Sequence, residues 1–98
     1  MTDIVDVIFG YSDRIKNSRT PESIMSHGEG EVVELREELE KFKAGEAAGE
    51  DGIVGEVADV LACMIDLLRV TNPNLTADDF RQVVINKCDK WVAKYGDK

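Results

Sequence analysis

A chain of 98 residues is long enough for one small domain. Its 20 acidic and 12 basic residues give a formal net charge of −8. This balance argues against a nucleic-acid-binding protein, because such proteins use lysine and arginine to displace the counterions of the phosphate backbone. Apolar residues make up 43% of the chain, so we expect a folded core and not a disordered acidic tail.

The sequence predicts neither a membrane segment nor a targeting segment. The longest apolar-rich run, residues 53–68, is too short to span a bilayer and carries three carboxylates. The first ten residues have neither the basic start and cleavage site of a signal peptide nor the arginines of a transit peptide. Cys63 and Cys88 have apolar neighbours and form no C-x-x-C pair, so we interpret them as reduced core thiols. We therefore expect a cytoplasmic protein without nucleic-acid or membrane partners.

Apolar residues recur with a helical period in four segments, and no segment alternates like a strand. The predicted helices span residues 3–17, 31–43, 53–68 and 77–95. Residues 45–52, GEAAGEDG, form a flexible turn that joins the second and third helices in antiparallel order. The stretch before Glu31 is left unassigned because Gly28 and Gly30 weaken a helix, and His27 is interpreted as a solvated loop residue.

These segments predict a single all-α domain over residues 1–98, a four-helix, antiparallel, bundle-like protomer. In the third helix, twelve of the sixteen residues 53–68 are apolar, and they occupy every side of the helix. A helix that is apolar all round is buried all round, yet so small a domain has little material to cover it. We therefore expect oligomerisation to complete the core, in a homodimer or a dimer of dimers.

Carboxylates occur where their burial is costly. Glu31, Glu34 and Glu38 follow the border of the apolar stripe of the second helix, and Glu56 projects from an apolar strip of the third, with Asp59 one turn on. If the short turn lays the two helices side by side, Glu31 and Glu34 face Glu56 and Asp59, and their charges repel. A hard divalent cation with oxygen ligands, Mg²⁺ or Mn²⁺ as a substitute, reverses this repulsion. Alternatively, Glu56 and Asp59 form salt bridges between chains at an oligomer seam.

The same carboxylates carry a family resemblance. Glu31 and Glu34 form an E-x-x-E pair, and Glu56 and Asp59 form an E-x-x-D pair within EVADVLACMIDLL. This pattern resembles the MazG-like branch of the all-α nucleoside triphosphate pyrophosphatase superfamily, over about residues 25–95. The resemblance implies Mg²⁺-dependent hydrolysis of a nucleoside triphosphate to a monophosphate and pyrophosphate. It further implies that these four residues hold the metal, and that Glu34, or its rival Glu38, orients the attacking water.

The last helix extends the resemblance. Members of the family carry a segment like K-M-x-K-N-x-x-R-Y, and Lys87 and Lys90 match it, whereas Trp91 replaces the asparagine and Lys94 the arginine. The three lysines are thereby implied in substrate binding, with a weaker grip on phosphate at Lys94 than arginine would provide. Independently, Lys87 lies within the apolar stripe of its helix and needs an anion, either a carboxylate of the third helix or a substrate phosphate. Trp91 is able to stack on a base, but we interpret it as a core or interface residue.

Three hypotheses remain open at this point. The first is a nucleoside triphosphate pyrophosphatase that clears non-standard or surplus nucleotides. A second keeps the chemistry but takes phosphoribosyl-ATP as substrate, and the lysines of the last helix argue against it. The third is a non-catalytic acidic helical oligomer that binds a partner protein. The sequence does not specify the base or the sugar, because the pocket that reads them depends on loops and on a second subunit.

Overall fold

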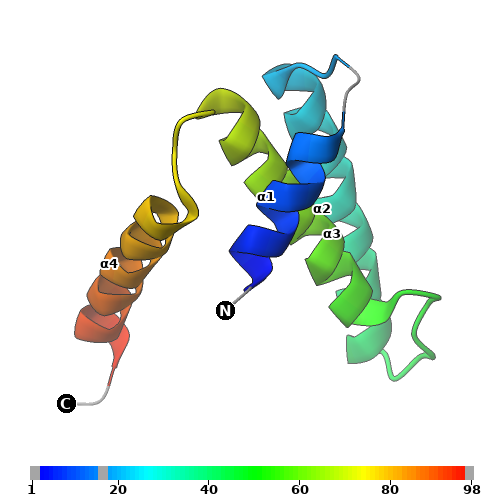
Figure 1. Ribbon diagram of the computed structural model, residues 1–98. Helices are drawn as coiled ribbons and strands as arrows, with labels where there is room; N and C mark the ends of the chain where they lie inside the picture. The colour runs from blue at the N-terminus through cyan, green and yellow to red at the C-terminus, as the bar shows by residue number, and fades with distance from the viewer. Residues whose placement is uncertain (1–2, 16–17, 97–98) are drawn as a thin grey trace.

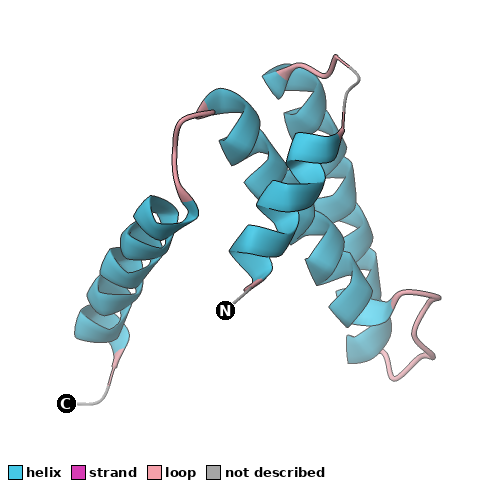
Figure 2. Ribbon diagram, viewed as in Figure 1, coloured by secondary structure: helices cyan, strands magenta, loops and turns pink. Residues whose placement is uncertain are grey.

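The computed structural model describes residues 3–15 and 18–96. Over these residues the chain forms four α-helices and no strand, so the predicted all-α architecture is confirmed (Figures 1 and 2). The helices are α1 (Ile4–Arg14), α2 (Pro21–Lys43), α3 (Gly52–Thr71) and α4 (Ala77–Tyr95). Within the described residues, none of them combines the length and the hydropathy that crossing a membrane requires.

Local capping explains where three of the helices begin. In each, the side chain of the residue before the first turn accepts a hydrogen bond from the backbone N–H of the third helical residue, whose side chain accepts one from the backbone N–H of the capping residue. These reciprocal pairs are Asp3 with Asp6, Thr20 with Ser23 and Thr76 with Asp79. Pro21 occupies the first position of α2, where its missing N–H costs nothing.

The second helix is longer than its prediction from residue 31, because it includes Gly28 and Gly30. Gly28 is buried against α3, where an added Cβ would lie 2.7 Å from Met64 Cε. A side chain at this position would therefore require the flexible end of Met64 to move. His27 consequently lies on a helix and not in a loop, although its side chain is 69% exposed.

The fold centres on the antiparallel pair α2 and α3, called here the hairpin. The first helix packs on α3, and Val5 and Phe9 of α1 form the buried core with Ile65 of α3. The start of α4 joins this core through Ala77 and Phe80. The N-terminal two thirds of the chain thus form one continuous packing unit.

Most of α4 stands apart from that unit (Figure 1). Within the described residues, no Cα atom of α4 comes within 8 Å of one in α2 or α3, and α4 has no buried residue. Its apolar side, which includes Trp91, is therefore not core within the single chain, and Cys88 is exposed, which corrects the prediction of a buried thiol. The antiparallel order of the helices is as predicted, but the bundle contacts of the last helix are confined to its beginning.

Candidate metal centre

Four carboxylates meet between the two helices of the hairpin. Glu31 and Glu34 come from α2, and Glu56 and Asp59 from α3. One carboxylate oxygen from each lies within 4.8 Å of those of the other three. The spacing of three residues within each helix turns both members of a pair to the same side, and the antiparallel arrangement brings the pairs face to face. We call these residues the carboxylate cluster.

The cluster has an inner and an outer pair. Glu56 is 9% exposed and Glu31 is half-buried, whereas Glu34 and Asp59 are exposed. Glu31 Oε2 and Glu56 Oε2 are buried, and within the described structure neither accepts a hydrogen bond. A buried polar atom without a partner is costly, and more so when it is charged. Glu31 and Glu56 therefore each offer a buried oxygen atom that has no hydrogen-bond partner among the described residues.

Burial and mutual repulsion both act on the inner pair. Burial raises the pKa of Glu31 and of Glu56 above the ordinary value, and the negative charges of Glu34 and Asp59 raise both pKa values further. Asp51 adds to the effect at Glu56. These directions are those expected for carboxylates placed together out of water without matching cations.

One basic side chain reaches the cluster. His27 Nε2 lies 3.1 Å from Glu31 Oε1, one turn away on α2. Among residues 3–15 and 18–96, no lysine or arginine forms an ion pair with any of the four carboxylates. Glu56 and Asp59 thus have no lysine or arginine partner among the described residues of their own chain, and salt bridges between chains stay an alternative prediction.

The donor set suits a hard divalent cation. All four side chains offer carboxylate oxygens, the ligands that such ions prefer. An ion there would meet the unpartnered oxygens of the inner pair and reverse the repulsion that raises their pKa values. The residues present therefore fit a bound metal ion.

Glu38, the alternative to Glu34 for orienting the attacking water, lies outside the carboxylate cluster and has different partners. Its carboxylate is buried and accepts hydrogen bonds from Lys41 Nζ and from the backbone N–H of Gly49, both at 2.9 Å. The Lys41 hydrogen bond, followed by that of Gly49, lowers the pKa of Glu38. Glu38 is not among the cluster residues, and its contacts hold the loop between α2 and α3.

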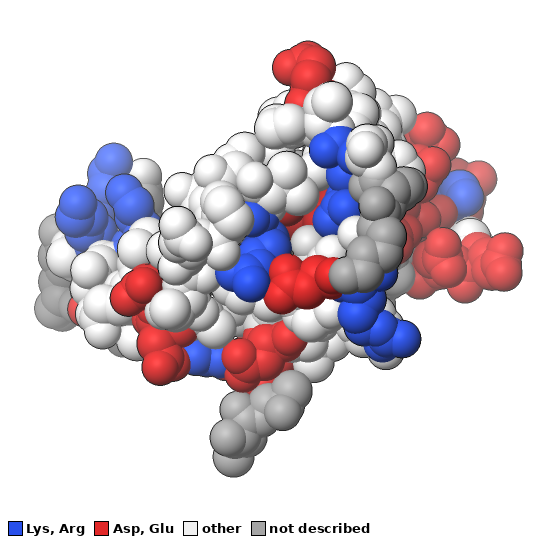
Figure 3. Space-filling model, turned by 45° about the horizontal axis from the view of Figure 1, so that its top comes forward, with Lys and Arg blue, Asp and Glu red and all other residues white. Residues whose placement is uncertain are grey.

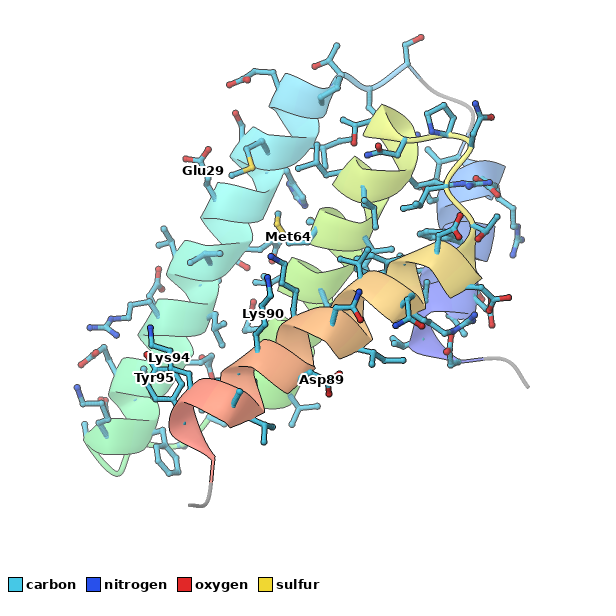
Figure 4. The ribbon with its side chains drawn as sticks, turned by 90° about the vertical axis from the view of Figure 1, so that its left-hand side faces the viewer. Glu29, Met64, Asp89, Lys90, Lys94 and Tyr95 are labelled. Atoms are coloured by element: carbon cyan, nitrogen blue, oxygen red, sulfur yellow. The ribbon has the colours of Figure 1, made fainter. Side chains whose placement is uncertain are left out.

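The lysines of the last helix are not brought to the cluster. Lys87, Lys90 and Lys94 are exposed on α4, which has no Cα atom near α2 or α3 in the described part of the chain. In the view from the α4 side, Met64 is visible between α2 and α3 (Figure 4). Met64 is five positions after Asp59, which places the two about 140° apart around α3. The hairpin thus has two faces, one with the cluster and one that is open toward α4.

A cavity adjoins the cluster side of α3. It measures about 320 Å³, lies between α1 and α3, and is lined by Ile8, Tyr11, Ser12, Ile15, Ala62, Cys63 and Asp66. Asp66 pairs with Arg19 at 2.5 Å and accepts a hydrogen bond from Ser12 Oγ at 2.5 Å. A second hollow shares Cys63 and Asp66 and reaches His27. Sequence reasoning missed this cavity, although the spacing of seven residues from Asp59 to Asp66 places both on one side of α3.

No protein-family profile, curated protein or solved structure gives a significant match to this chain. The family resemblance therefore depends on the four carboxylates and the lysine segment alone.

Proposed function

We propose that the protein is a cytoplasmic, Mg²⁺-dependent nucleoside triphosphate pyrophosphatase that acts as a homo-oligomer, with Mn²⁺ as a substitute ion. The observation that carries this proposal is the carboxylate cluster, in which two buried oxygens have no partner. The E-x-x-E and E-x-x-D spacing that predicted the cluster is also the pattern on which the resemblance to this superfamily depends.

Each residue of the cluster has a role in the proposal. Glu31 and Glu56 form the buried floor, while Glu34 and Asp59 form the solvent edge through which a phosphate chain approaches. When bound, a divalent ion supplies charge neutralisation for phosphate oxygens and increases the acidity of water. Without that positive charge, the carboxylates would repel a triphosphate.

The proposed reaction is hydrolysis of the α–β phosphoanhydride bond. A water oxygen attacks the α-phosphorus, the bond from that phosphorus to the bridging oxygen breaks, and pyrophosphate leaves with the electron pair. The exposed carboxylate of Glu34 orients the water and accepts its proton, which then passes to solvent. Glu38 has no part in this step because Lys41 and Gly49 already occupy its oxygens.

The decisive experiment measures pyrophosphate release from a panel of ribo- and deoxyribonucleoside triphosphates and from phosphoribosyl-ATP. With Mg²⁺ we expect activity on at least one substrate, and Glu56→Gln or Asp59→Asn should reduce it by on the order of 100-fold or more, because even residues that support a metal ligand contribute 10–100-fold. Glu37→Gln is the matched control, since Glu37 is an exposed glutamate of α2 outside the cluster. If no substrate releases pyrophosphate with Mg²⁺ or Mn²⁺, the proposal is wrong.

A further inference from the structure

The last helix exposes an apolar face that no other described segment of the chain covers. Val84, Cys88, Trp91 and Tyr95 fall within about 60° of one another around α4 and form what we call the α4 face. Trp91 is 66% exposed and Tyr95 is 70% exposed. Large aromatic side chains carry much of the energy of protein interfaces when they are covered.

The hairpin exposes a second apolar face. Met25 and Val32 of α2 lie on the same side as Val57, Leu61 and Met64 of α3, and we call this set the hairpin face. Val32 is 49% exposed and Val57 is 46% exposed. The hairpin face lies on the side of the hairpin opposite Asp59, as their positions around α3 indicate. A partner that covers this face therefore leaves the carboxylate cluster open.

The total surface shows that the chain has area to bury. Its accessible surface is 7417 Å² for a mass of 10.9 kDa. A compact monomer of this mass exposes about 5,600 Å², so the excess is about 1,800 Å². A specific dimer buries about 800 Å² on each partner, and permanent dimers bury more. The radius of gyration, 15.8 Å, likewise exceeds the value of about 13 Å expected for a compact chain of this length.

Ion pairs keep α4 away from its own hairpin. Arg81, in the second turn of α4, binds Asp3, which caps the start of α1, and Asp6 of α1, at 2.6 Å each. Arg69 donates hydrogen bonds to the carbonyl oxygens of Pro73 and Leu75, in the segment between α3 and α4. Folding α4 back onto its own α3 would break these contacts, so the hairpin face is free for another molecule.

The two faces are complementary in charge as well as in polarity. Lys87, Lys90 and Lys94 follow one edge of the α4 face. Around α2, Glu22 and Glu29 lie at the outer edge of the hairpin face, next to Val32, and we call them the acidic edge. Neither forms an ion pair with a described residue. In the space-filling view, basic side chains lie at the α4 end and in the middle of this face, and acidic ones are densest at the end opposite α4 (Figure 3). A second copy of this chain therefore presents what each face lacks.

We infer that the protein forms a symmetric dimer in which the α4 face of each chain packs across the hairpin face of its partner. The row of lysines then lies along the acidic edge of the partner's α2. This inference rests on the homo-oligomer of the proposed function and gives it a defined interface. It requires neither a metal ion nor a nucleotide, so loss of the dimer and loss of pyrophosphate release are separate results.

Sedimentation equilibrium of the full chain tests the dimer. At about 100 µM the wild type should have the mass of two chains, because interfaces of this size have dissociation constants of µM or below. Trp91→Glu and Leu61→Glu each place a charge on one of the two faces and should give monomers. Val33→Glu is the control, since Val33 is an exposed valine of α2 outside the hairpin face. A monomeric wild type, or a dimeric Trp91→Glu variant, overturns the inference.

Mixing the two monomeric variants separates this arrangement from the other symmetric ones. A heterodimer of Trp91→Glu with Leu61→Glu contains one unaltered interface, made of an intact α4 face and an intact hairpin face, so the mixture should regain dimer mass in part. In a mixed pair, an interface of α4 against α4, or of hairpin against hairpin, always contains an introduced charge. Failure to recover any dimer therefore refutes the packing of the α4 face on the partner's hairpin face.

The thiol of Cys88 provides a measurement without a change in either apolar face. In Cys63→Ser protein, the only thiol is Cys88, which is exposed in the single chain. The dimer covers it, so its rate of alkylation should fall as protein concentration rises and should become independent of concentration in the Leu61→Glu background. A rate that is fast at all concentrations contradicts the proposed packing.

Discussion

Glu56 carries a buried carboxylate oxygen, Oε2, that accepts no hydrogen bond from any described residue. We expect Glu56→Gln to raise the free energy of unfolding of the metal-free protein at neutral pH, because the change removes a charge that burial and Glu34 disfavour. The gain should shrink on acidification. A carboxyl whose pKa is raised by folding weakens the folded state as pH rises above the ordinary value of 4.5, and below that value Glu56 is itself protonated.

Urea unfolding in a chelator, over a series of pH values, measures this difference, with Glu37→Gln as the control. If Glu56 is instead a salt-bridge partner, Glu56→Gln should destabilise the protein at neutral pH with or without Mg²⁺. That outcome would remove the physical basis of the metal centre.

Asp66 has the opposite electrostatics. Its hydrogen bonds with Arg19, and then with Ser12, lower its pKa. A carboxyl whose pKa is lowered by folding stabilises the protein above the ordinary value of 3.8, and this stability is lost as pH falls through the lowered value. Asp66→Asn should therefore cost about 1–3 kcal/mol at neutral pH and should lose less stability than the wild type upon acidification below pH 4.

Acid unfolding followed by circular dichroism tests this prediction. Asp89→Asn is the control, since Asp89 is an exposed residue of α4 (Figure 4). Equal acid sensitivity of Asp66→Asn and the wild type would show that the Arg19 pair contributes no pH-dependent stability.

The residues of the cluster were predictable and their neighbours were not. Glu31, Glu34, Glu56 and Asp59 follow from helical spacing and a short turn, both of which the sequence carries. The environment of Glu38 depends on the loop conformation that aims the N–H of Gly49 at it, and no periodicity encodes that. The distance of the α4 lysines from the cluster depends on the direction in which α4 leaves the rest of the fold, and helical spacing does not specify that direction.

At the scale of the helices, most of the fold was predictable. Amphipathic spacing located all four helices, and α4 has the predicted bounds, 77–95. The largest error lies at the start of α2, because glycine has poor helix propensity, whereas Gly28 is buried in the helix next to Met64 of α3. Tertiary contact thus outweighed a local preference.

The two glycines of α2 should respond differently to substitution. Nothing lies within 4 Å of a Cβ added at Gly30, so Gly30→Ala should raise the free energy of unfolding by about 0.5–1 kcal/mol. Gly28→Leu should lower it by about 1–3 kcal/mol, because the larger side chain separates α2 from α3. Urea unfolding compares both with the wild type. Destabilisation by Gly30→Ala would mean that α2 is not helical at that point.

At the scale of the whole molecule, periodicity identified the apolar stripe of α4 but not what covers it. The contacts of Arg81 with Asp3 and Asp6 join residues nearly at opposite ends of the chain, and such long-range pairs are not apparent in a local pattern. They direct α4 away from the hairpin, so an arrangement that the sequence suggested as one bundle becomes a packing unit and a projecting helix.

Binding of Mg²⁺ should stabilise the whole fold, because the carboxylate cluster joins α2 to α3 and exists only in the folded chain. At a Mg²⁺ concentration of about 100 times the dissociation constant, binding adds about 2.7 kcal/mol per site. For a domain of this size that corresponds to a rise in the thermal midpoint of about 10 °C or more. A non-hydrolysable nucleoside triphosphate should raise the midpoint further.

Calorimetry measures the thermal midpoint. The protein concentration is held fixed, because the midpoint of a dimer varies with concentration. A sodium salt of equal ionic strength controls for screening of the acidic surface, and Asp59→Asn should abolish the part of the rise that is specific to Mg²⁺. An equal rise with sodium, or an undiminished rise in Asp59→Asn, would show that the cluster is not a metal site.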